Sequence, residues 1–384
     1  MLRERAPRTR FSLARAYAIA LKEFVQMRRD RLTFAMIVGI PIAQVLLFGY
    51  AINTDPKALP TAVVDYDRTE FTRSIATSLA NTGYFAVVPT PPDASAADAM
   101  LARGEVQFSL VFPAGFSRAL VRGERPSVLL AADATDPSAT ANAIAAVLQA
   151  GTSALAHDLT GTLAPLAGQA PPFSIDIQRR YNPEGVTEYN IVPGLLAVVL
   201  QLTMVMMTAF AITRERERGT YEGLLATPVL RSEVMAGKIT PYIVVGLLQS
   251  AIILLAARYL FDVPMQGSLA LLGVAMMLYI AALLALGYAI STLASNQLQA
   301  MQMTFFFFLP TMLLSGFMFP FRGMPRWAQW LGEVFPATHF LRIVRGILLK
   351  GNAAPDIAPH VWPIAVFLLV VSAIAMWRYR QTLD

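Results

Sequence analysis

Long apolar runs separated by polar stretches dominate the chain. An apolar run of about 17 to 25 residues is long enough to cross a bilayer as a helix. Runs of this kind occupy residues 32–53, 189–213, 239–257, 268–293, 303–319 and 361–377. The pattern therefore predicts an α-helical polytopic membrane protein with about six transmembrane helices.

Residues 54–188 differ from these runs, because they are polar, rich in alanine and interrupted by proline. Strand patterns fall at 61–65, 106–112 and 127–131, and helix patterns fall at 71–82, 94–103 and 138–163. The first two helix patterns end at Gly83 and Gly104, and glycine is a common helix stop. The alternation predicts a small α/β domain inserted after the first span.

The distribution of charge predicts an orientation in the membrane. Residues 1–31 hold nine Lys and Arg against three acidic residues, so this segment carries the whole net charge of +6. Arg15, Lys22 and Arg29 share a stripe at helical spacing, which predicts a basic amphipathic helix on a membrane surface. Because basic residues beside a span stay in the cytoplasm, we expect both termini inside and residues 54–188 outside.

Two segments between the spans have distinct compositions. The loop 214–238 begins with three arginines, which predicts a cytoplasmic location. The segment 320–360 is too apolar for an ordinary loop and too interrupted by proline and glycine for a span, so we expect outer re-entrant or interfacial helices. It also carries five basic residues, against the positive-inside tendency, and the sequence leaves its depth open.

The charged loop contains the pattern of a short helix. Gly219 can end the incoming helix, Thr220 can cap a new one, and Glu222 then complements the helix dipole in the first turn. Leu224 and Leu225 give this helix an apolar tip. We interpret the loop as an element that binds in a groove of another protein. The alternative is a solvated loop without a partner.

The charged loop also resembles a known one. The letters R-E-R-E-R-G-T-Y-E-G-L-L-A-T-P at 214–228, followed by Gly237-Lys238, resemble the cytoplasmic loop of ABC-2 type exporter permeases. In that family the loop holds a coupling helix that docks on a separate ATPase. Residues 310–351 are a second match to ABC-2 permeases. The pieces 64–65, 111–117 and 180–184, the last followed by 192–194, resemble the subgroup with a large extracytoplasmic domain after the first span.

The resemblance implies a permease subunit of a bacterial inner membrane that pairs with a second permease chain, identical or different, and with two ATPase copies. The partner would bind ATP and Mg, and the substrate moved outward would be a drug-like molecule, a lipid or an envelope component. A periplasmic adaptor protein is a further candidate partner. The residues expected at the ATPase contact are Glu217, Gly219, Thr220, Glu222, Leu224, Leu225, Thr227 and Pro228.

Composition excludes several function classes. The chain has no cysteine and only three histidines, which lie far apart, so we expect no disulfide and no metal site. No G-x-x-x-x-G-K-[ST] motif occurs, so we expect ATP chemistry on a partner, no enzyme activity and no bound cofactor. The net charge reflects membrane topology, and nothing indicates nucleic-acid binding. The alternative function is a membrane-anchored sensor or assembly scaffold whose outer domain binds a ligand or a protein.

A basic stripe in the outer segment is the second candidate site. His339, Arg342 and Arg345 are spaced three apart, so they share roughly one face of a short helix. One hypothesis is that they line the exit of a substrate path and hold an anionic group. The other is that they pair with lipid phosphates and anchor the helix at the membrane surface.

Overall fold

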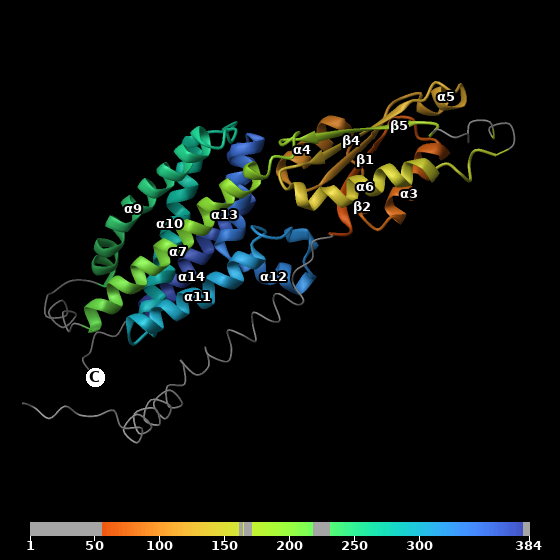
Figure 1. The fold of residues 1–384 in the computed structure, drawn as a ribbon. Coiled ribbons are helices and arrows are strands. Elements are labelled where there is room, and N and C mark those ends of the chain that lie inside the picture. The colour runs from red at the N-terminus through yellow and green to blue at the C-terminus, as the bar shows by residue number, and fades with distance from the viewer. Residues whose placement is uncertain (1–55, 161–163, 165–170, 218–230, 379–384) are drawn as a thin grey trace, which may run out of the picture. The chain divides into compact units, whose positions relative to one another are not determined.

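The fold is known from a computed structural model that describes residues 56–160, 164, 171–217 and 231–378 (Figure 1). The predictions for the amphipathic helix at 1–31 and the first span at 32–53 lie outside the described residues. The predictions for seven residues of the ATPase contact also lie outside the described residues: Gly219, Thr220, Glu222, Leu224, Leu225, Thr227 and Pro228.

The segment predicted to be an α/β domain contains one five-stranded sheet in the order β2-β1-β3-β4-β5. The strands are β1 Leu59–Asp65, β2 Phe85–Val87, β3 Phe108–Phe112, β4 Ser127–Asp133 and β5 Ser174–Arg180. Strand β1 runs parallel to both β2 and β3, β4 is antiparallel to β3, and β5 is parallel to β4. Ala62 pairs with Ser109, and Leu110 with Leu130, which sets the register of the central strands.

Helices cover both faces of this sheet. They are α3 Glu70–Asn81, α4 Ala94–Arg103, α5 Phe116–Val121 and α6 Pro137–Ser153. Along β1, Leu59 packs in one apolar cluster with residues of α3, α5 and α6, whereas Ala62 and Val64 pack with α4 on the opposite face. This follows from the two-residue period of a strand, whose side chains alternate between the faces.

Most elements of this domain agree with the sequence patterns. The expected strands at 61–65, 106–112 and 127–131 correspond to β1, β3 and β4, and the helix expected at 94–103 is α4. The helix expected over 138–163 is shorter, because α6 ends at Ser153, where Gly151, Thr152 and Ser153 are poor helix formers. The prediction missed β2, α5 and β5, which are short or carry few apolar residues.

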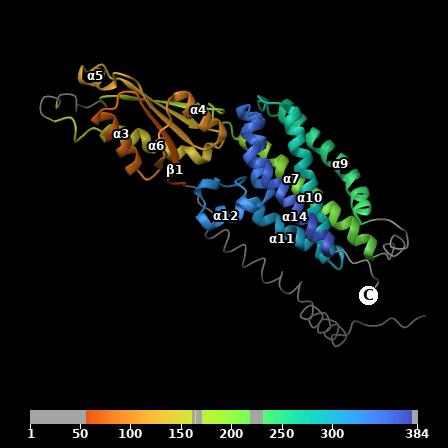
Figure 2. The same cartoon turned by 180° about the vertical axis from the view of Figure 1, so that it is seen from behind.

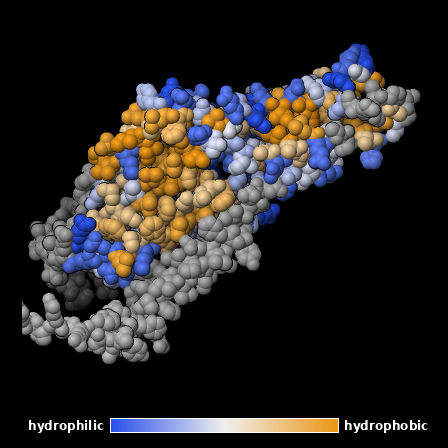
Figure 3. Space-filling view, viewed as in Figure 1, coloured by the Kyte–Doolittle hydropathy of each residue, from blue (hydrophilic) through white to orange (hydrophobic). Residues whose placement is uncertain are grey.

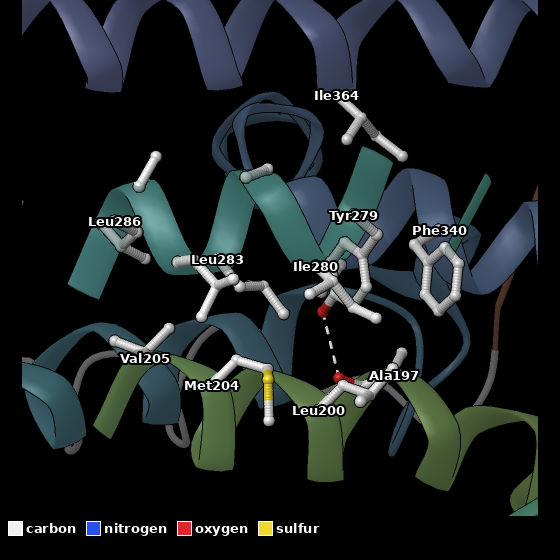
Figure 4. Close-up of a cluster of buried hydrophobic side chains, with 14 of the residues drawn as sticks. Ala197, Leu200, Met204, Val205, Tyr279, Ile280, Leu283, Leu286, Phe340 and Ile364 are labelled. Carbon is white, nitrogen blue, oxygen red and sulfur yellow. Dashed lines mark hydrogen bonds between the residues drawn. The ribbon is translucent and has the colours of Figure 1, made fainter. Parts of the chain in front are cut away.

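The longer described helices outside this sheet segment form a bundle. They are α7 Thr187–Glu217, α9 Arg231–Tyr259, α10 Leu269–Leu293, α11 Gln297–Leu314 and α14 Ala354–Arg378. Helix α10 packs against α7 on one side and α14 on the other (Figure 2). Tyr279 of α10 is fully buried, and its hydroxyl donates to the Ala197 carbonyl of α7 at 3.0 Å (Figure 4). Its ring stacks on Phe340 with the centroids 4.1 Å apart, which ties the bundle to the next segment.

Four of the described helices are long and apolar enough to cross a membrane, at residues 187–214, 242–259, 269–293 and 354–378. They correspond to four of the predicted spans, although α14 begins at Ala354 rather than near residue 361. The span predicted at 303–319 falls on α11, whose first turns contain Gln297, Gln299 and Gln302 and are less apolar. The count of six spans stays a prediction.

The outer face of α9 is apolar. Val244, Leu248, Ile252 and Leu255 are each more than half exposed and recur every three or four residues. Helix α9 lies within a broad hydrophobic surface over the bundle (Figure 3). Such a stripe on a helix that already packs against α7 and α10 is the surface expected to face lipid.

Between α11 and α14 the chain forms short helices rather than an irregular loop. These are a 3-10 turn at Phe321–Gly323, α12 Arg326–Val334, α13 Pro336–Arg345 and a π-helical turn at Gly346–Lys350. Helix α13 packs against α7, α10 and α14. Short helices are therefore present in the segment 320–360. Helix α12 buries only Ala328 and Gly332, whereas α13 is buried on almost all sides.

Candidate functional site

A cavity of about 440 Å³ brings together polar residues from distant parts of the chain. The α/β segment contributes the turn after α4 and the residues that follow β4, and the short helices and the start of α14 contribute the rest. We call this space the polar cavity. Its charged and ionisable lining residues are Arg103, Glu105, Asp133, Asp136, Arg322, Glu333, Arg342, Arg345, Lys350, Asp356 and His360.

Arg342 of α13 has its charge neutralised inside the protein. Its Nη1 donates to Glu333 Oε2 at 3.0 Å and its Nη2 donates to Glu333 Oε1 at 2.7 Å, a two-pronged pair with α12. The guanidinium also lies 4.5 Å from the centre of the Phe321 ring. Burial opposes the charge of Glu333, but the hydrogen bonds and charge of Arg342 outweigh it and lower the pKa of that carboxyl. The Glu333 carboxyl is therefore ionised at neutral pH.

Arg345, one turn further along α13, has neutral partners. Its Nη2 donates to Asn190 Oδ1 at 2.5 Å, and its Nη1 donates to the Gly316 carbonyl at 3.2 Å. Its Nε is buried and has no hydrogen-bond partner. Asn190, near the start of α7, donates in turn to the Thr135 carbonyl at 3.0 Å. Arg345 thus lies where α7, the end of α11 and the loop after β4 meet.

His339 lies behind the cavity rather than in its lining. Its side chain is almost fully buried, and its Nε2 is 2.8 Å from the Glu333 carbonyl oxygen. Three residues turn a helix by about 300°, so positions 339 and 345 differ by about 120° around α13. The structure consequently brings Arg342 and Arg345 to the cavity. The His339 ring instead contacts Glu333 of α12, and its centre lies 5.7 Å from that of the His360 ring of α14.

Lys350 joins the π-helical turn to the α/β segment. Its Nζ lies 2.5 Å from Asp133 Oδ2, and it also donates to the Leu101 carbonyl at 3.1 Å. Nearby, Arg322 Nη2 donates to the Gly104 carbonyl at 2.9 Å. Burial, with a smaller contribution from the charge of Asp133, raises the pKa of Tyr181 to about 12, so its hydroxyl stays protonated beside this pair.

The described residues include no group of three or more His, Cys, Asp or Glu placed to hold a metal ion. The wall of the cavity contains the ion pairs Arg103–Glu105, Arg342–Glu333 and Lys350–Asp133 and the hydrogen-bonded Arg322. Arg345 in the same wall has one guanidinium nitrogen without a partner.

Comparison with known proteins decides the family. Residues 31–377 match the model of the ABC-2 family transporter protein family. The chain belongs to the ABC-2 transporter family. Because the match runs from the first predicted span to the last helix, the chain is a membrane permease of this family.

Curated relatives agree with the family match. The permease is 29% identical over 377 residues to the "Probable multidrug ABC transporter permease YbhS" of Escherichia coli K12, with 94% of each chain covered. It is 28% identical to the "Probable multidrug ABC transporter permease YbhR" of the same organism. That match covers 96% of this chain and 98% of YbhR. It is 24% identical to the "ABC transporter G family member 20" of Dictyostelium discoideum, and the match spans 49% of that longer protein.

The structure describes one residue of the predicted ATPase contact, Glu217, at the end of the bundle away from the polar cavity. Glu217 is the last residue of α7, and both of its carboxylate oxygens accept hydrogen bonds from Gln297, the first residue of α11. Sequence reasoning placed Glu217 at the loop but did not pair it with Gln297. A partner 80 residues away leaves no local signal.

Several cavity residues were also missed as site residues. Asp133 ends strand β4, where an aspartate commonly serves the following turn, and its Oδ1 does accept from Thr135. Its Oδ2 accepts from Lys350, which lies 217 residues further along the chain, and no local sequence pattern indicates such a distant partner. Glu333 carried a usable signal, because a single acid among the basic residues of 320–350 is a natural ion-pair partner.

Proposed function

We propose that the permease is the membrane-spanning subunit of an ATP-driven exporter and moves its substrate outward with a separate ATPase. The family match over 31–377 carries this proposal. The sequence supports it, because it contains no phosphate-binding loop of its own and has a charged loop between α7 and α9. Relatives named multidrug permeases favour a drug-like substrate over a lipid or an envelope component.

In this proposal the loop 214–238 faces the cytoplasm and binds the ATPase. Two permease chains, identical or different, and two ATPase copies form the transporter in a bacterial inner membrane, with the α/β domain outside. A periplasmic adaptor would then bind on the side of the α/β domain. The sheet and the bundle are compatible with this arrangement, because both termini of the α/β segment lead into helices or predicted spans.

The polar cavity is the proposed outer end of the path. Arg342 is paired with Glu333 and so has little charge left for a lipid phosphate or a substrate. Arg345 is the better candidate to hold an anionic or hydrogen-bonding group, because its partners are neutral oxygens and its Nε has none. We therefore assign the binding role to Arg345, and a positioning role to Arg342.

Transport into inverted membrane vesicles tests the proposal. The permease is co-expressed with the ABC ATPase subunits of its own genome, and uptake of ethidium, Hoechst 33342 and doxorubicin is followed on adding ATP. We expect vanadate-sensitive uptake of at least one dye and co-purification of an ATPase with the tagged permease. A permease that binds no ATPase and drives no uptake would contradict the proposal and favour the sensor or scaffold.

A further inference from the structure

The last residue of α7 and the first residue of α11 are joined by two hydrogen bonds. We propose that Glu217 is a positioning residue that links the charged loop to α11, so that movement of the loop is passed along α11 to the wall of the polar cavity. This inference rests on the proposed function, since it describes how ATPase movement reaches the outer end.

The geometry at this contact restricts both distance and direction. Gln297 donates its backbone N–H to Glu217 Oε1 at 2.8 Å and its Nε2–H to Glu217 Oε2 at 2.5 Å. A carboxylate that accepts two bonds from one residue holds that residue in a defined orientation. The backbone N–H is also one of the donors that a helix N-terminus leaves without an internal partner, and a negative charge there is favourable.

The turn between α10 and α11 is held by its own hydrogen bonds. Asn296 caps α11 by accepting from the Gln299 N–H at 2.8 Å. The Gln299 side chain then accepts from the Ser295 N–H at 2.8 Å. Because α11 also packs against α7, Glu217 connects to a helix of the bundle rather than to a free turn.

The opposite end of α11 reaches the polar cavity. The helix ends at Leu314, and the next two residues, Ser315 and Gly316, line the cavity. The Gly316 carbonyl accepts from Arg345, the residue to which we assign substrate binding. A displacement of Gln297 along the helix axis would therefore move the acceptor of Arg345.

A purely structural role would differ in its consequences. If Glu217 only caps α11, its removal lowers stability and leaves the transport rate of the folded protein unchanged. If it positions α11, its removal lowers the rate while the ATPase remains bound.

The test measures the rate of ATP-driven dye uptake into the inverted vesicles. Each rate is divided by the amount of permease and of bound ATPase in the membrane. We expect Glu217→Ala to lower ATP-driven uptake about three- to fivefold, the effect of losing modest hydrogen bonds to an exposed charge. Gln297→Ala should lower it less, because the backbone N–H bond remains. The double variant Glu217→Gln with Gln297→Glu should restore uptake, since the new amide oxygen at 217 still accepts from the backbone N–H of residue 297 and the side-chain bond forms with donor and acceptor exchanged. Glu188→Ala, at the exposed opposite end of α7, is the matched control.

A second readout does not depend on transport. Since the chain has no cysteine, spin labels can be attached at Arg214→Cys and Leu298→Cys, two exposed positions that flank the contact. We expect one narrow distance distribution that Glu217→Ala broadens and the exchanged pair restores.

Different results would overturn the proposed exporter function and the positioning role of Glu217. Absence of ATP-driven uptake and of a bound ATPase in the unaltered protein would overturn the exporter, and this inference with it. Normal uptake by Glu217→Ala, or failure of the exchanged pair to restore it, would overturn this inference alone.

Discussion

Lys350 and Asp133 form a buried ion pair across 217 residues of chain, with the side chains only 8% and 6% exposed. Removing one partner leaves the other charge buried and unpaired, which typically costs about 3–5 kcal/mol. We expect Lys350→Met to lower the unfolding temperature of the detergent-solubilised permease. Lys350→Met combined with Asp133→Asn should cost less than the sum of the single variants. Additive losses would show that the two side chains do not interact.

Close packing between α7 and α10 depends on Gly287. A Cβ added there would lie 2.6 Å from the Val205 carbonyl oxygen and 2.8 Å from Thr208 Cβ, so the helices would have to separate. Overpacking of this kind costs about 1–3 kcal/mol, and we expect Gly287→Ala to lower thermal stability and yield. Gly273→Ala on the same helix is the control, because its Cβ meets nothing within 4 Å. Equal stability of the two variants would contradict the close approach.

Arg345 separates the two roles considered for the basic residues. If it holds a substrate group, Arg345→Gln should raise the KM for doxorubicin, whose carbonyl and hydroxyl oxygens can accept from the guanidinium, by about tenfold, the value of a hydrogen bond to a charged group. If the basic residues only anchor a helix, Arg345→Gln should reduce yield and leave the KM unchanged. Initial rates of uptake over a range of dye concentrations decide between these results.

Orientation is tested by reporter fusions. A fluorescent protein that matures only in the cytoplasm should be dark when inserted at Gly123, in the exposed turn after α5, and bright when fused after Arg218. This follows from the positive charge of residues 1–31 and of the loop 214–238. The reverse pattern would invert the predicted topology.

The sequence predicted the elements better than the contacts. The long apolar helices and the strand–helix alternation were visible because each is a local pattern of apolar residues. Strand β5 was not, since Ile175 and Ile177 are its only apolar residues and the rest of its seven residues are polar or charged. The polar cavity was only partly visible: Arg342 and Arg345 stood out as basic residues on an apolar helix. Their partners Glu333 and Asn190 depend on how distant segments pack, which no local pattern encodes.

The charged loop carries the central claim, and Glu222→Arg tests it most directly. The substitution reverses a charge at the expected ATPase contact, where like charges placed together cost several kcal/mol. We predict that ATP-driven dye uptake falls by about tenfold or more and that less ATPase co-purifies, while the amount of folded permease in the membrane is unchanged. Normal uptake by this variant at normal expression would contradict the account.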